Sequence, residues 1–432
     1  MYLKGTHPRL RRTRHYLNPR VTIVLLVLIL SGLLVISGWR SGDIQPAFIP
    51  TPTATRLARS YAEEAEAQFA AGHLPQAIDA YEKARAIDTQ NVDYWVALAR
   101  IQIYARRYAD ALATAEMGLL VAPNNARTKA VYAWTLDWNT TTGCHCKTLA
   151  EAEAAAVQAI AIDGNYAPAH AYYSEILNDG QKWEQGSSQA QLALSLDPNS
   201  LDAHRAMGYA NESVGNYEGA IEHYKDALTI NPNLITIYIS LGLNYRILQR
   251  YDEAIAAFGK ANAIDPYDIE PYLALSRTYY QTDDFGAAVQ YLQQALNLQP
   301  ASADIHGRLG LIYFKAKNYE GAEPELRLAV FGGPLKDDKG NTVTDAQGNP
   351  VTVQGLPLNA GSLEFYYTMG NLMAYTYQCK PDQAPAILNQ VLNFAPDNPT
   401  VIGSYEESTG ICNNFLAGTL TPQPTPTVTP QP

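Results

Sequence analysis

Charged residues and cysteines are both scarce in this sequence. Asp, Glu, Lys and Arg make up 17% of its 432 residues, below the usual share of about 25%. The four cysteines are too few to build the fold on disulfides. The phosphate loop Gly-x-x-x-x-Gly-Lys, the nucleophile elbow Gly-x-Ser-x-Gly and the zinc motif His-Glu-x-x-His are also missing. We therefore expect no enzyme and no cofactor.

Long uncharged apolar runs are rare as well, and residues 21–39 are the exception. Thirteen of these 19 residues are Val, Ile or Leu. As a helix the run spans about 28 Å, close to the hydrocarbon thickness of a membrane. We predict a transmembrane helix over residues 21–39. A cleaved signal peptide is the alternative, although the run is longer than the usual apolar segment of about 7–15 residues.

The charge distribution predicts how the chain crosses the membrane. Residues 1–20 contain six basic residues and no acidic ones, so the remainder carries 25 − 42 = −17. Basic flanks stay in the cytoplasm. We therefore predict that residues 1–20 are a basic cytoplasmic segment and that the rest of the chain lies outside the cytoplasm. A remainder this acidic repels phosphate backbones, which excludes nucleic acid as the expected partner.

Two segments rich in proline and threonine flank the rest of the chain. Residues 40–57 include Pro46, Pro50 and Pro52, which predicts an extended linker. Residues 419–432 consist of Thr, Pro and Gln apart from Leu420 and Val428, which predicts a disordered tail. From this composition we expect a protein of a bacterial cell envelope.

Between these flanks, proline recurs every 34 residues. Pro123 and Pro396 keep the register if one insertion of 7 residues and one of 28 are allowed. A fixed period of this length is the sequence signature of a repeat architecture. The uninterrupted series is Pro198, Pro232, Pro266, Pro300 and Pro334.

Small residues recur inside each unit, at fixed distances before the proline position. A small residue lets two helix axes approach closely, and an aromatic three or four residues away fills the remaining space. Each unit therefore predicts two packed amphipathic helices. The residues twelve positions before the proline are Ala111, Gly186, Ala220, Ala254, Ala288, Ala322 and Ala384. Those five positions before it are Gly118, Ala193, Ala227, Ala261, Ala295 and Ala329.

The units resemble tetratricopeptide repeats (TPRs), a 34-residue pattern with small and aromatic positions and a closing proline. One repeat matches nearly completely through Gly242, Tyr245, Tyr251, Ala254, Phe258, Ala261 and Pro266. The resemblance implies an all-α fold, a right-handed superhelical solenoid of about nine helix-turn-helix repeats. We place repeats 1–8 at residues 58–334, repeat 9 at residues 363–398, and a capping helix at residues 399–418.

The two insertions carry their own signals. Residues 335–362 contain two Gly-Asn turns beside β-branched residues, which predicts a small β-hairpin. Residues 139–147, between the helices of the third repeat, contain Cys144, His145 and Cys146. These three are only a weak metal candidate, because zinc takes four ligands at wider spacing. A local disulfide or a structural loop is the favoured alternative.

Cys379 and Cys412 are a candidate disulfide. The TPR arrangement places Cys379 at the end of the first helix of repeat 9 and Cys412 near the end of the capping helix. Alternating helix directions bring these two ends to the same side of the stack. Outside the cytoplasm such thiols tend to oxidise.

The resemblance also implies a concave groove lined by the first helix of each repeat. Tyr, Trp and Arg carry much of the energy in protein interfaces. The alternative is that many of these tyrosines pack between helices, and we expect the scattered histidines to be core or interface residues too. The candidate groove residues are Arg100, Tyr104, Trp134, Trp138, Tyr172, Arg205, Tyr209, Arg246, Arg277, Tyr280, Phe314 and Tyr367. Asp137 and Glu175 lie between them.

These features predict a membrane-tethered scaffold that is not an enzyme. It would be displayed outside the cytoplasm and bind a peptide or protein segment in its groove. The alternative is an accessory subunit of an envelope enzyme, or of an assembly or secretion complex.

Overall fold

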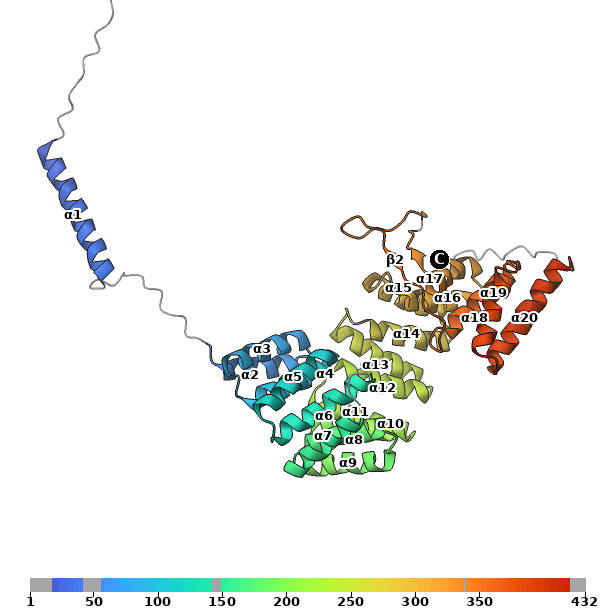
Figure 1. Cartoon of the computed structure of the whole chain (residues 1–432), viewed down its shortest axis with the longest axis horizontal. Coiled ribbons are helices and arrows are strands. Elements are labelled where there is room, and N and C mark those ends of the chain that lie inside the picture. The colour runs from blue at the N-terminus through green and yellow to red at the C-terminus, as the bar shows by residue number, and fades with distance from the viewer. Residues whose placement is uncertain (1–17, 42–55, 142–148, 338, 420–432) are drawn as a thin grey trace, which may run out of the picture. The chain divides into compact units, whose positions relative to one another are not determined.

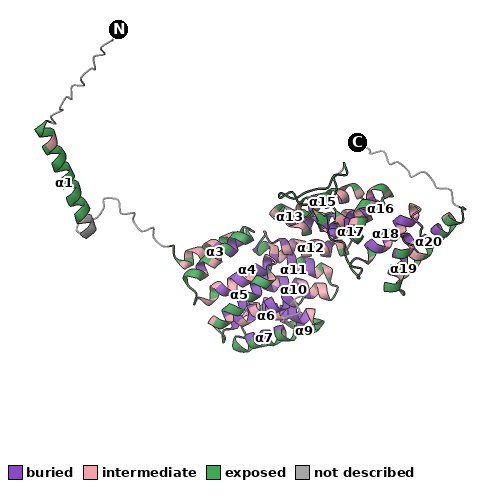
Figure 2. Ribbon diagram, turned by 45° about the horizontal axis from the view of Figure 1, so that its top comes forward, coloured by how far each residue is buried: buried purple, intermediate pink, exposed green. Residues whose placement is uncertain are grey.

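The computed structural model describes residues 18–41, 56–141, 149–337 and 339–419 (Figure 1). The chain divides into two units, Met1–Leu57 and Ala58–Pro432. In the first unit, α1 (Pro19–Ser41) is a single helix whose Pro19–Gly38 stretch has a mean hydropathy of 2.8. Its apolar side chains are exposed (Figure 2). By length and composition α1 could cross a membrane.

The described residues of the second unit form nine helix pairs and one final helix, which confirms the predicted helical solenoid. The pairs are α2 (Ala58–Ala70) and α3 (Leu74–Ile87), α4 (Val92–Tyr104) and α5 (Tyr108–Val121), α6 (Ala126–Thr141) and α7 (Leu149–Ile162), α8 (Ala167–Asp179) and α9 (Trp183–Leu196), α10 (Leu201–Ser213) and α11 (Tyr217–Ile230), α12 (Ile235–Ile247) and α13 (Tyr251–Ile264), α14 (Ile269–Gln281) and α15 (Phe285–Leu298), α16 (Ala303–Lys315) and α17 (Tyr319–Phe331), and α18 (Leu363–Tyr375) and α19 (Ala384–Phe394). The final helix is α20 (Pro399–Leu416).

Small residues at the helix crossings hold the pairs together. All of the predicted small positions, from Ala111 to Ala384, are buried. A Cβ added to Gly242 would lie 2.5 Å from the Phe258 ring, so only glycine fits where α12 crosses α13. This close approach explains why small and aromatic residues alternate in each repeat.

The turn inside a pair reverses the chain at one residue with left-handed backbone geometry. Gly72 and Gly215 adopt this conformation with φ of 81° and 77°, at little cost because they lack a Cβ. In the other described turns a residue with a Cβ adopts the left-handed conformation, although this conformation costs such a residue roughly 1–2 kcal/mol. Those residues are Arg106, Gln181, Gln249, Asp283, Lys317 and Tyr377, with φ between 58° and 60°.

The segment after α17 forms the predicted small sheet, although one of its two strands lies at another position. β1 (Gly333–Pro334), just before the predicted insertion, pairs antiparallel with β2 (Thr352–Val353), which lies among the β-branched residues that predict the hairpin. Between them, Asp337 Oδ1 accepts hydrogen bonds from the Lys339 and Asn341 amides. Asp345 closes a second turn in the same way. These side chains therefore set the loop geometry that the Gly-Asn pattern only partly predicts.

Two details of the predicted boundaries are wrong. α6 continues to Thr141, so the insertion in repeat 3 begins later than residue 139. Cys144, His145 and Cys146 lie outside the described residues. α18 ends at Tyr375, which places Cys379 in the turn that follows rather than at the helix end. Cys379 is nonetheless joined to Cys412 of α20 by a disulfide, with a Cα–Cα distance of 5.1 Å.

Candidate functional site

A buried carboxylate, Asp202, links helices from three different repeats. It lies in the first turn of α10 and is 3% exposed. Arg100 Nε of α4 donates to it at 2.8 Å, Tyr104 Oη of α4 at 2.7 Å and Tyr172 Oη of α8 at 3.0 Å. Burial acts to raise its pKa, but Arg100 and Arg205 outweigh that effect, so the pKa of Asp202 is lowered.

A second ion pair lies beside the first, between Arg205 of α10 and Glu175 of α8. Arg205 Nη2 is 2.6 Å from Glu175 Oε1, and Trp134 Nε1 donates to Glu175 Oε2 at 2.8 Å. The Arg205 guanidinium lies 4.4 Å from the centre of the Trp134 ring, which stacks on Tyr172. Burial raises the pKa of Glu175 to about 7, even though Arg205 acts to lower it.

Two further acids, Asp137 of α6 and Asp179 of α8, interact at the edge of this network. Tyr209 Oη donates to Asp179 Oδ1. Burial, followed by repulsion from Asp179 and Glu175, raises the pKa of Asp137 well above its ordinary value. Burial therefore favours the protonated form of Asp137, and the neighbouring acids add to that effect.

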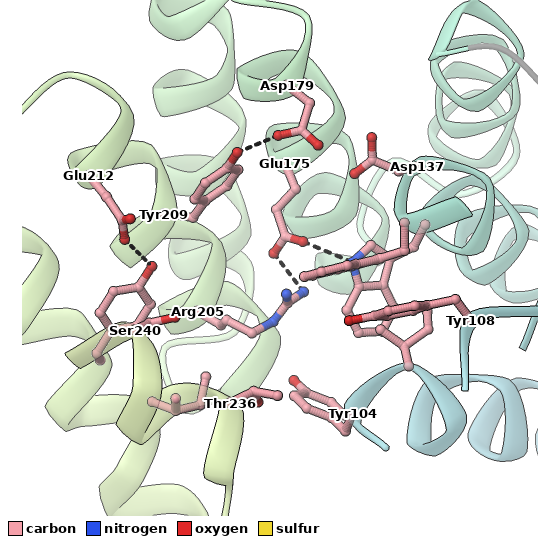
Figure 3. A pocket seen from close by; sticks show the side chains of 15 residues that line it. Tyr104, Tyr108, Asp137, Glu175, Asp179, Arg205, Tyr209, Glu212, Thr236 and Ser240 are labelled. Atoms are coloured by element: carbon pink, nitrogen blue, oxygen red, sulfur yellow. Dashed lines mark hydrogen bonds and ion pairs between the residues drawn. The ribbon is translucent and has the colours of Figure 1, made fainter. Parts of the chain in front are cut away.

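The second ion pair and the two further acids border a cavity of about 280 Å³, which we call the acidic cavity (Figure 3). Four carboxylates and a single guanidinium line it, together with several aromatic rings. Arg205 Nε and Thr236 Oγ1 are buried in its wall and have no hydrogen-bond partner within the part of the chain that the structure describes. The lining residues are Ile103, Tyr104, Tyr108, Trp134, Asp137, Trp138, Glu175, Asp179, Arg205, Tyr209, Glu212, Tyr224, Thr236, Ile237 and Ser240.

Family models described as tetratricopeptide repeat match residues 68–134, 235–268 and 273–337, and one described as TPR repeat matches residues 213–246. The chain is a tetratricopeptide-repeat protein. Solved structures agree with this fold. One, "Crystal structure of APC/C hetero-tetramer Cut9-Hcn1", has a TM-score of 0.54 at 17% identity and covers 77% of this chain. The match spans only 59% of that chain's own length.

A second TPR structure, "Human IFIT1 dimer with PPP-AAAA", has a TM-score of 0.53 at 17% identity and covers 82% of this chain and 83% of its own. At these identities the likeness concerns the fold alone. A search of curated proteins finds no match. Repeats of this kind are stacked scaffolds with extended concave binding surfaces, so this TPR protein is an interaction scaffold.

The structure places five of the predicted groove residues of this TPR protein around the acidic cavity: Tyr104, Trp134, Trp138, Arg205 and Tyr209. Arg100 and Tyr172 lie behind it, in the network around Asp202. The sequence predicts that these residues line an open groove. In the structure, however, Trp134 is fully buried and Tyr172 is 2% exposed. The cause is contact between distant repeats, because Arg100 and Asp202 are 102 residues apart in sequence.

Sequence reasoning missed several residues of this site, above all Asp202 and Asp179. Acidic residues are common in the first turn of a helix because they interact with its dipole, so Asp202 gave no distinct signal. Asp179 ends α8, and its partner Tyr209 lies 30 residues later. That separation is one helical turn short of the 34-residue repeat, so the signal that could have identified the pair is a tyrosine one turn before the position equivalent to Asp179 in the next repeat.

A second cavity, of about 340 Å³, lies between α14, α16 and α18, and we call it the arginine cavity. Arg277, Tyr280, Arg308 and Glu364 line it. Arg308 pairs with Asp304 one turn away at 2.7 Å, whereas Arg277 is exposed and has no ion pair among the described residues. Burial and then repulsion from Arg277 lower the pKa of Arg246 to about 10.

The remaining predicted groove residues lie in helix contacts. The Phe314 ring packs against Tyr319 and Tyr375, with ring centres 5.5 Å and 5.9 Å away. Tyr367 is half-buried, and burial raises its pKa to about 12. For these two aromatics the structure matches the alternative interpretation, packing between helices.

Proposed function

We propose that this TPR protein is a non-enzymatic scaffold that binds a segment of a partner protein at the acidic cavity. The single observation that carries the proposal is the composition of that cavity, with four carboxyl groups facing one guanidinium, so that its net charge stays negative although Asp137 keeps a proton. A negatively charged cavity in an acidic domain attracts a cation. Lysine and arginine are the side chains that supply one.

The aromatic residues favour the same ligand. Tyr104, Tyr108, Trp138 and Tyr209 line the cavity, and aromatic rings attract cations through their negative faces. We therefore infer a partner segment with at least one basic side chain.

We further propose that α1 anchors the scaffold in a membrane and that the repeats lie outside the cytoplasm, in a bacterial envelope. The apolar length of α1 and the six basic residues before residue 21 support this orientation. Mass spectrometry of protein extracted from membranes tests the anchor. We expect a mass that includes residues 1–41, and a chain that starts after residue 40 would contradict it.

Binding of a defined peptide tests the ligand class. The probe is acetyl-Gly-Arg-Gly-amide, and its neutral isostere replaces arginine by citrulline. Calorimetry on the full chain in neutral detergent should show that the arginine peptide binds about tenfold more tightly, a difference of about 1.4 kcal/mol. Equal affinities would contradict a cation-binding cavity.

Two matched variants then locate the binding. Asp179→Asn should remove most of the preference for the arginine peptide. Asp79→Asn, which neutralises a carboxylate 64% exposed and outside the cavity, should keep it. Cross-linking in intact cells, followed by partner identification, separates a scaffold with many extended clients from an accessory subunit with one stable catalytic partner.

A further inference from the structure

Three repeats carry a histidine at the same position of their first helix: His170, His204 and His306. In each, Nε2 lies beside a backbone carbonyl six residues earlier, at 3.0 Å, 2.9 Å and 3.0 Å respectively. A carbonyl oxygen only accepts hydrogen bonds, so Nε2 carries a proton in all three. Nδ1 therefore faces the second helix of the repeat, where the residue 19 positions later lies opposite.

In two of these repeats the residue opposite is a single close polar partner of Nδ1. His170 Nδ1 lies 2.7 Å from Gln189 Oε1, and His306 Nδ1 lies 2.5 Å from Glu325 Oε2. Both histidines are only 3% exposed. These two pairs match the core histidines that the sequence predicts.

The repeat formed by α10 and α11 differs, because a second histidine takes the opposite position. His204 Nδ1 lies 3.4 Å from His223 Nδ1 and 3.5 Å from Asp226 Oδ2. His223 Nδ1 is 4.0 Å from the same carboxylate oxygen. All three atoms lie within 4.8 Å of one another. A separation of 3.4 Å between two nitrogens is long for a hydrogen bond.

The same distances suit the corners of a metal site. Zinc binds His nitrogen at about 2.0–2.1 Å with tetrahedral geometry, which separates neighbouring ligand atoms by about 3.3–3.4 Å. His223 and Asp226 are three residues apart on α11 and share one face. The Pro198 carbonyl fixes the tautomer of His204, as second-shell acceptors do for zinc-binding histidines.

We propose that His204 Nδ1, His223 Nδ1 and Asp226 Oδ2 bind a zinc ion between α10 and α11. The side chains of these residues are 14%, 23% and 47% exposed, so the ion can enter from solvent. The fourth position faces solvent and takes a water molecule or a donor atom from a partner. Asp226 needs to move by only about 0.6 Å to complete the three-ligand geometry.

His223→Gln tests the site with little risk to folding, because glutamine is the natural residue at the equivalent position, Gln189. Glu325→Gln makes the same type of change at the His306 pair and serves as the matched control. Both are made with Cys144 and Cys146 replaced by serine, so that these two cysteines add no metal binding. The full chain, without a histidine tag, is titrated with zinc by calorimetry and with cobalt by visible absorption.

The parent and Glu325→Gln chains should each bind one zinc ion and give the absorption bands of tetrahedral cobalt. His223→Gln should bind zinc at least about tenfold more weakly. A parent chain that binds no zinc, or a His223→Gln chain that binds it as tightly as the parent, would overturn the proposal.

A transplant of the site provides a second measurement. Gln189→His together with Leu192→Asp places the same three side chains around His170, and Leu192 is 40% exposed, so the change is tolerable. The expected result is two zinc ions per chain. A count that stays at one would overturn the claim that these three positions suffice.

Discussion

The acidic cavity and the arginine cavity are built from the same kind of repeat, yet their charges are arranged differently. Around the acidic cavity, ion pairs are buried and join residues far apart in sequence, as in Arg100–Asp202. Around the arginine cavity, Arg308 pairs with Asp304 one turn away, and both side chains are about 40% exposed. Buried long-range pairs make a region rigid, whereas exposed local pairs leave a surface adaptable.

This difference changes how the repeats depend on one another. In most repeat arrays each unit contacts only its neighbours. Here the Asn231 amide of repeat 5 donates to the Phe69 carbonyl of repeat 1, and Arg106 of repeat 2 forms an ion pair with Asp268. The first six repeats are therefore expected to unfold more cooperatively than the last three.

Removing Asp202 should have the largest effect on this cooperative region. Asp202→Ala leaves Arg100 without its carboxylate partner, and breaking a buried ion pair costs about 3–5 kcal/mol. Urea unfolding followed by tryptophan fluorescence measures the loss, because Trp134 lies in the network. Asp304→Ala, in the exposed pair, should cost no more than about 1 kcal/mol. Equal losses would remove the distinction between the two regions.

The disulfide should matter only to the C-terminal region. Replacing Cys379 and Cys412 by serine releases a constraint across 33 residues of sequence, which destabilises that end by roughly 3–4 kcal/mol. Hydrogen exchange should accelerate in α18, α19 and α20. Exchange in α8 and α10 should stay as it is, and a general acceleration would mean that the two regions unfold together.

The fold could be read from the sequence because its causes are local and periodic. The positions of Gly242, Ala254 and Phe258 repeat every 34 residues, and each acts on the helix beside it. The acidic cavity could be read only in part. Tyr104 and Arg205 could be identified from their residue type and their position within the repeat. Their burial, however, depends on how far each repeat rotates relative to the one before it. Small rotations accumulate over several repeats, and no single residue encodes them.

Gly208→Ala should have a smaller effect, confined to the acidic cavity. A Cβ at this position would lie 2.6 Å from the Tyr224 ring, which lines that cavity. Overpacking of this kind costs about 1–3 kcal/mol. Gly259→Ala is the control, since nothing lies within 4 Å of its added Cβ, and a helical alanine there should stabilise by up to about 1 kcal/mol. Thermal unfolding separates the two, and similar shifts would contradict tight packing behind the cavity.

The smallest expected effect is the pH dependence contributed by Asp137. Because its pKa is raised in the folded state, the folded chain keeps a proton that the unfolded chain has released once the pH exceeds the ordinary value of 3.8. Its contribution to stability is therefore full below pH 3.8 and is lost as the pH rises through the raised pKa. Glu175, with a pKa raised to about 7, acts in the same direction.

Asp137→Asn mimics the protonated carboxyl group. It should remove the part of the fall in stability with rising pH that Asp137 contributes. Between pH 5 and pH 7 the variant should lose less stability than the parent chain, because its amide has no proton to release. Unfolding free energies measured at several pH values give both slopes. Asp283→Asn, at a carboxylate 71% exposed near the arginine cavity, should follow the parent. If Asp137→Asn follows the parent too, the carboxyl group carries no extra proton, and the acidic cavity holds more negative charge than its packing implies.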